Sequence, residues 1–104
     1  MNAIFKAMTR YIEEVIRQYP FLIFRIERKT WERYNAVIVF CRQKDKPPPV
    51  QDYPIVIIRP TADGKGYLIK KSFMQVTTCR TASDALKKAK GIIEKRCASI
   101  GNGR

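Results

Sequence analysis

The chain has 104 residues, 45% of them hydrophobic and 29% charged, and its 21 Lys and Arg exceed its 9 Asp and Glu, giving a net charge of +12. This length is typical of one domain, and the apolar fraction excludes a disordered chain, which lacks the residues to build a core. The chain has no histidine and only three widely spaced cysteines, which excludes a zinc finger and any mechanism that needs a histidine base.

The first predicted element is an amphipathic helix over residues 3–19. Its apolar residues recur at the three-to-four spacing of a helical stripe, while charged residues occupy the other positions. Pro20 ends this helix, because the residue before a proline is forced out of the helical conformation.

Two strands are predicted next, over residues 21–28 and 33–42. In the second strand both alternating sets of residues are apolar, which indicates a central strand or a sheet covered on both faces. One set is Tyr34, Ala36, Ile38 and Phe40, and the other is Val37, Val39 and Cys41.

Residues 43–54 are predicted to form a long loop, because three successive prolines cannot donate hydrogen bonds to a sheet. A short β-branched strand follows over residues 55–59, and Asp63-Gly64 marks a turn within residues 60–66. Residues 67–78 then read either as one bent strand or as two short strands around Lys70-Lys71.

The last predicted element is a helix that starts at Thr81. This threonine suits the N-cap, and Asp84 three residues later suits the positive start of a helix. Gly101 is placed to stop the helix. Residues 1–100 are therefore expected to form a single α+β domain, with residues 101–104 as a flexible tail.

The predicted fold is a four- or five-stranded antiparallel sheet flanked in sequence by two helices. Each helix has one apolar stripe, so both are expected to pack on the same face of the sheet. The open face would then carry Ile23, Arg25, Val37 and Val39. Its apolar residues Ile23, Val37 and Val39 are a predicted interface, with homodimerisation as one use.

No chemistry beyond binding is indicated by the sequence. Asp45, Asp52 and Asp63 lie in predicted loops, but no motif organises them into a metal site. We therefore expect a non-enzymatic protein with no catalytic residue, cofactor, metal or small-molecule substrate. No membrane span or secretion signal is visible, so we expect a cytoplasmic protein in which Cys41, Cys79 and Cys97 are buried free thiols.

The positive charge is concentrated toward the carboxyl-terminal part of the chain. Residues 1–64 have a net charge of +4, and residues 65–104 have a net charge of +8. Much of the excess falls on the last helix and the segment before it, which could form a phosphate-binding stripe; the alternative is an ordinary solvated helix face. The candidate residues are Lys70, Lys71, Arg80, Lys87, Lys88, Lys90 and Lys95.

A second candidate is the basic segment from Arg25 to Arg33, which includes the turn between the first two predicted strands. It combines cations with an aromatic ring, as single-strand and RNA surfaces do. The candidate residues are Arg25, Arg28, Lys29, Trp31 and Arg33. The alternative is an ordinary hairpin in which Glu27 and Glu32 pair with these cations and Trp31 only caps the core.

The expected function is binding of nucleic acid, mainly through phosphates and with limited sequence specificity, because a basic domain attracts polyanions. The sequence does not choose between DNA and RNA, or between single and double strands. The alternative is a protein-interaction module, either a homodimer or an inhibitor or adaptor of an acidic partner, that uses the open sheet face.

Overall fold

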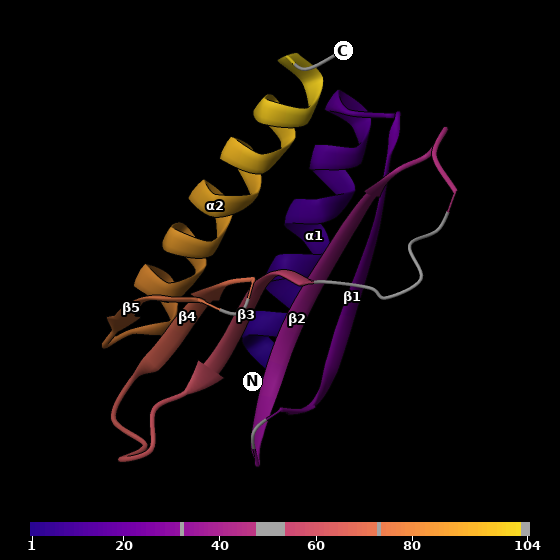
Figure 1. Ribbon diagram of the computed structural model, residues 1–104. Helices are drawn as coiled ribbons and strands as arrows, with labels where there is room; N and C mark the ends of the chain where they lie inside the picture. The colour runs from indigo at the N-terminus through magenta and orange to yellow at the C-terminus, as the bar shows by residue number, and fades with distance from the viewer. Residues whose placement is uncertain (32, 48–53, 73, 103–104) are drawn as a thin grey trace.

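The computed structural model describes residues 1–31, 33–47, 54–72 and 74–102. It shows the predicted fold class: an α+β chain in which an antiparallel sheet of five strands lies between two helices in sequence (Figure 1). The elements are α1 (Asn2–Gln18), β1 (Leu22–Trp31), β2 (Tyr34–Gln43), β3 (Pro54–Pro60), β4 (Tyr67–Lys71), β5 (Met74–Cys79) and α2 (Ala82–Asn102).

Helix α1 forms where the periodicity predicts it and ends just before Pro20. Its buried residues are Ile4, Met8, Ile12 and Val15, which recur at helical spacing along one stripe. Tyr19 caps the carboxyl end, and its amide donates to the carbonyl of Val15 at 2.9 Å.

The sheet is a meander in which every strand pairs with its neighbour in sequence, in the order β1-β2-β3-β4-β5. Strands β1 and β2 pair without a break from Leu22 opposite Gln43 to Trp31 opposite Tyr34. Most of the basic segment is therefore strand rather than turn. At its tip Arg33 has a φ of 73°, a left-handed conformation that costs a residue with a side chain about 1–2 kcal/mol.

Residues 67–78 form two strands, which decides between the two predicted alternatives. Strand β4 ends at Lys71, and Ser72 takes a φ of 57° before β5 begins at Met74. The change of direction therefore falls immediately after Lys71.

Helix α2 starts with the predicted cap, since the amide of Asp84 donates to Oγ1 of Thr81 at 3.1 Å. The predicted stop at Gly101 is wrong, because α2 continues through that glycine to Asn102. Glycine lowers helix propensity without forbidding helix. Residues 103–104 lie outside the described residues.

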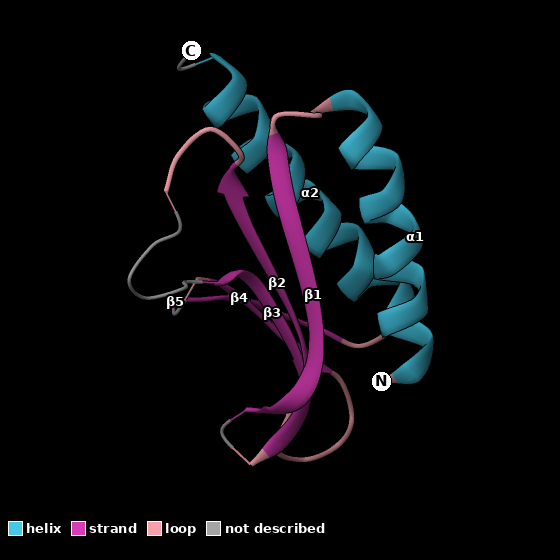
Figure 2. Cartoon of the chain, turned by 90° about the vertical axis from the view of Figure 1, so that its right-hand side faces the viewer, coloured by secondary structure: helices cyan, strands magenta, loops and turns pink. Residues whose placement is uncertain are grey.

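Both helices cover the same face of the sheet, as predicted, and leave the other face without a helix (Figure 2). Helix α1 packs over β1, and α2 packs over β3, β4 and β5. The two helices also contact each other through Tyr11, whose hydroxyl lies 3.3 Å from the carbonyl oxygen of Lys90 and 3.1 Å from Oε1 of Glu94. We call the face away from the helices the outer face.

Strand β2 is buried on both of its faces. Val37 and Val39 belong to the core under the helices, with no exposed surface. Ala36 and Ile38 are equally buried but belong to a second, smaller cluster on the outer face, together with Phe40 and Ile57. This confirms the central position that the two apolar sets of the strand predict.

The proline-rich segment predicted as a loop falls largely outside the described residues, which omit residues 48–53. Its first part, up to Pro47, is a turn and coil, and Pro54 already belongs to β3.

Alanine substitutions at Gly66 and Gly91 test how tightly the backbone is packed around each glycine. A Cβ on Gly66 would lie 2.5 Å from the carbonyl oxygen of Cys79, whereas a Cβ on Gly91 would meet nothing within 4 Å. We expect Gly66→Ala to lower the free energy of unfolding by about 1–3 kcal/mol, because the backbone must shift. We expect Gly91→Ala to raise it by about 0.5–1 kcal/mol, because alanine favours helix. Urea unfolding measures both, and destabilisation by Gly91→Ala would contradict the open surroundings of that residue.

Candidate nucleic-acid interface

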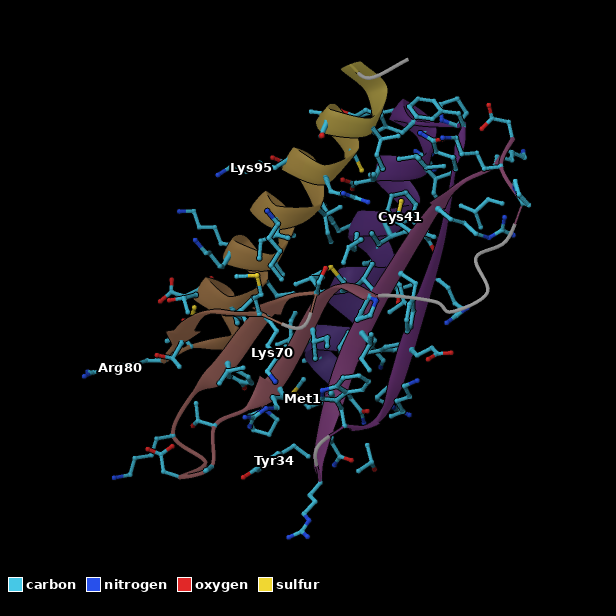
Figure 3. All side chains as sticks on the ribbon, viewed as in Figure 1. Met1, Tyr34, Cys41, Lys70, Arg80 and Lys95 are labelled. Atoms are coloured by element: carbon cyan, nitrogen blue, oxygen red, sulfur yellow. The ribbon has the colours of Figure 1, made fainter. Side chains whose placement is uncertain are left out.

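The predicted cations do not form a single patch, because the fold distributes them over two separate surfaces. Figure 3 shows Lys70 on the sheet, whereas Arg80 and Lys95 project outward from the α2 side of the molecule. We treat these as the helix surface and the sheet surface, and each has its own geometry.

The helix surface consists of four cations on α2 and just before it: Arg80, Lys87, Lys88 and Lys95. All four side chains are exposed. None forms an ion pair with a residue that the structure describes. Their charge is therefore available to a ligand.

Two open grooves lie near the start of α2. One, of about 500 Å³, has Lys65 and Arg80 along it, and the other, of about 330 Å³, has Lys87 and Lys88 along it. Cys79 lines both grooves.

Two carboxylates offset part of the positive charge along these grooves. Asp63 lines the first groove, and Asp84 lines the second. The hydroxyl of Thr61 and the amide of Lys65 donate to Asp63 and lower the pKa of its carboxyl, so it stays ionised.

Lys90 is not part of the helix surface, although the sequence groups it there. It is half-buried between the helices, with Nζ 5.3 Å from the centre of the Tyr11 ring. Burial, followed by the hydrogen bond to Glu94, raises the pKa of the Tyr11 phenol. Through its contact with the Tyr11 ring, Lys90 helps to join α1 and α2.

The sheet surface lies on the outer face and places cations over aromatic rings. The guanidinium of Arg25 lies 4.1 Å from the centre of the Phe40 ring, and Nζ of Lys29 lies 5.7 Å from the same centre. The guanidinium of Arg59 lies 4.5 Å from the centre of the Tyr34 ring. Lys70 from β4 completes the surface, opposite Ile57.

One carboxylate lies within the sheet surface. The carboxylate of Glu27 forms an ion pair with Arg25, 3.2 Å from its Nε, and a second with Lys29, 3.0 Å from its Nζ. Pairing of Glu27 with neighbouring cations was the predicted alternative to ligand binding. Both cations nevertheless keep about half of their side chains exposed, 50% for Arg25 and 47% for Lys29.

The other predicted residues of the basic segment lie elsewhere. Arg28 points to the helix side, where its guanidinium is 5.5 Å from the centre of the Phe5 ring. Arg33 occupies the hairpin tip, and Trp31 packs against the apolar cluster of the outer face. Lys71, opposite Val56, is exposed at the end of β4. The sequence-predicted set is therefore split between two faces.

The predicted placement of Val37 and Val39 on the open face is wrong. Both lie under the helices, and only Ile23 is on the outer face, half-buried. Phe24 pairs with Cys41 and Ile26 with Val39. Directly opposite residues of neighbouring strands lie on the same face of a sheet, so Val39 and, two residues away, Val37 share the helix-covered face with Phe24 and Ile26.

Among the described residues, the apolar side chains at the centre of the outer face are buried and do not form the exposed patch that the interface prediction requires. Ala36, Ile38 and Ile57 have no exposed surface, and Phe40 is 6% exposed. Among the described residues, the large hydrophobic side chains that are exposed are Ile16 on α1 and Met74 on β5.

Sequence reasoning missed Arg59 and the ring partners Tyr34 and Phe40. The signal was present, since alternation along residues 55–59 puts Arg59 on the same face as Ile57. Without the register, that face could not be matched to the face of Arg25.

The cysteines are free thiols, as expected in the sequence analysis. Cys97 is buried, whereas Cys41 and Cys79 are only half-buried. In the described ranges no three His, Cys, Asp or Glu side chains lie close enough together to hold a metal ion. Neither α1 nor α2 has the length and apolar character of a membrane-crossing helix.

Comparisons of this chain with protein-family models, with curated proteins and with solved structures found no match.

Two of the thiols, those of Cys41 and Cys97, make the stability of the fold dependent on pH. Burial raises the pKa of Cys41 to about 12 and that of Cys97 to about 11, from an ordinary value of 9.0. The folded state therefore retains protons that the unfolded state releases above pH 9, so this contribution to stability is complete below pH 9 and is lost as the pH rises toward 11–12. We expect the urea midpoint to fall between pH 8 and pH 10.5. The double variant Cys41→Ala/Cys97→Ala should show a shallower fall, and an equal slope would contradict the assignment.

Proposed function

We propose that this protein is a small, non-enzymatic domain that binds nucleic acid, mainly through phosphate contacts and with limited sequence specificity. The observation that carries the proposal is the helix surface, where Arg80, Lys87, Lys88 and Lys95 are exposed and have no ion-pair partner among the described residues. Cations gathered on one element are the electrostatic footprint of a polyanion site.

The chemistry of these residues supports contact with the backbone of the nucleic acid. Lysine is a mobile point charge with three donors, and it pairs with phosphate without fixing the orientation of a base. Phosphate contacts position a protein on nucleic acid and carry no direct sequence information. A surface of three lysines and one arginine therefore favours affinity over sequence selection.

The free thiols are consistent with a reducing, cytoplasmic location, which remains part of the proposal. An acidic protein partner is the alternative occupant of a basic surface, because charge steers association toward either ligand. The buried apolar residues of the outer face weaken the version of that alternative that relies on an exposed apolar sheet.

Charge reversal on the helix surface tests the proposal. We expect Lys87→Glu/Lys88→Glu/Lys95→Glu to weaken binding to duplex DNA at least about tenfold at low salt, and to reduce the dependence of log K on log salt by up to about 3, because three phosphate contacts are lost. Fluorescence anisotropy with a labelled duplex at a series of salt concentrations measures both quantities.

Helix α1 offers a matched control. Lys6→Glu/Arg10→Glu/Arg17→Glu changes the net charge by the same amount at exposed positions of the other helix. Equal loss of affinity in the two triple variants would show that total charge, and not the helix surface, governs binding. If the wild-type protein binds neither DNA nor RNA at low salt, the proposal is wrong and an acidic protein partner becomes the better hypothesis.

A further inference from the structure

Strand β5 lies at one edge of the sheet, beside the start of α2 (Figure 1). Among the described residues, no strand pairs with its outer edge, because its one partner is β4. Neighbouring residues of a strand direct their backbone N–H and C=O groups to opposite edges, so alternate residues of β5 direct these groups away from β4. Such a row of backbone groups is a template on which a further strand can pair.

The two edge strands differ in the residues that discourage strand addition. Proteins protect the edges of sheets with charged residues and prolines. Strand β1 contains four charged residues, which are Arg25, Glu27, Arg28 and Lys29. Strand β5 has the sequence MQVTTC, with no charge and no proline, and its valine and threonines favour extended backbone. Of the two edges, β5 is therefore the one that admits a further strand.

A groove of about 330 Å³ lies between β5 and α2, lined by Thr77, Cys79, Asp84, Lys87 and Lys88. Thr77 and Cys79 belong to the regular part of the edge, where three consecutive residues of β5 pair with Tyr67, Leu68 and Ile69 before the register shifts. Side chains of a strand alternate between the two faces of a sheet. The side chains on the helix side of a strand added here would therefore reach this groove.

The charge of the groove favours an acidic segment. Lys87 and Lys88 are exposed, have no ion-pair partner among the described residues and outnumber Asp84. Arg80, directly after β5, is a further exposed cation. Acidic side chains complement these charges. A second copy of this chain fits less well, because each copy has a net charge of +12 and pairing of two β5 strands would bring the cations of both grooves together.

We propose that β5 binds an extended acidic segment of a partner protein as a sixth strand of the sheet, with acidic side chains of the segment contacting Lys87 and Lys88. Main-chain hydrogen bonds to β5 supply affinity, and the cations select the charge of the segment. This inference goes beyond the proposed function, because it names a protein ligand and a main-chain mode of recognition. Lys87 and Lys88 also belong to the helix surface, so the bound segment occupies part of the proposed nucleic-acid site.

Synthetic peptides separate strand addition from charge attraction. The probe is a labelled octapeptide in which Glu and Val alternate, and we expect it to bind saturably at low salt in fluorescence anisotropy. The same peptide N-methylated at two adjacent central residues loses a donor from each of its edges and should bind at least about tenfold more weakly. A peptide with Lys in place of Glu should not bind, because the cations of the groove repel it.

Charge reversal tests the placement of the segment beside α2. We expect Lys87→Glu/Lys88→Glu to weaken binding of the acidic peptide at least about fivefold at low salt, because two attractive contacts become repulsive. The matched control is Lys6→Glu/Arg10→Glu, which makes the same change of charge at exposed positions of α1. The control should stay within about twofold of wild type, since salt screens charges that lie far from the ligand.

Amide hydrogen exchange of the wild-type protein gives a readout that does not depend on a variant folding. Pairing with a further strand protects amides that otherwise exchange with solvent. We expect the acidic peptide to slow exchange in Met74–Cys79 and to leave exchange in Leu22–Trp31, the other edge strand, unchanged.

The outcomes separate this proposal from the proposed function. Slower exchange in β5, together with weaker binding of the N-methylated peptide and of the Lys87→Glu/Lys88→Glu variant, supports strand addition. Absence of binding, equal binding of the N-methylated or the lysine peptide, or unchanged exchange in β5 overturns it. Nucleic acid is absent from these experiments, so their failure leaves the proposed function intact, and a failure to bind DNA and RNA leaves strand addition at β5 standing.

Discussion

Burial of β2 on both faces is the constraint on which the rest of the structure depends. Five consecutive residues, from Ala36 to Phe40, are buried, so two layers of side chains must cover this strand. The helices cover Val37 and Val39 on one face. The outer face has no helix, and long cationic side chains lie over its aromatic rings. Lysine and arginine can do this because a cation is attracted to the electron-rich face of an aromatic ring.

The two basic surfaces therefore differ in origin and in physical character. Cations of the sheet surface contact rings and a carboxylate, which restrict their positions. Cations of the helix surface are exposed on a helix whose opposite side is the buried one, so nothing in the folding of the domain restricts them. The arginines of the sheet surface are long side chains with planar charged groups that lie against rings, whereas the lysines of the helix surface are flexible point charges.

Sequence patterns predicted the elements and layers because apolar periodicity reports burial directly. The helix stripes, the central position of β2 and the cap at Thr81 follow from local residues. The face on which Val37 lies depends on the register with β1, which the flanking residues do not determine. The ring contact of Arg59 joins residues far apart in the chain, and no local pattern contains it. The candidate site was thus predictable as a set of cations, but not as two surfaces.

The meander topology has a consequence for how the chain reaches this fold. Every strand pairs with the next one in sequence, so each pairing closes a loop that is short compared with the whole chain, at modest entropic cost. The helices come from opposite ends of the chain, and Tyr11 meets Glu94 across a separation of 83 residues. Contacts between distant residues are the slow ones to form. We therefore expect the hairpins to form before the helices meet, with Val37 and Val39 open to water until the helices pack on the sheet.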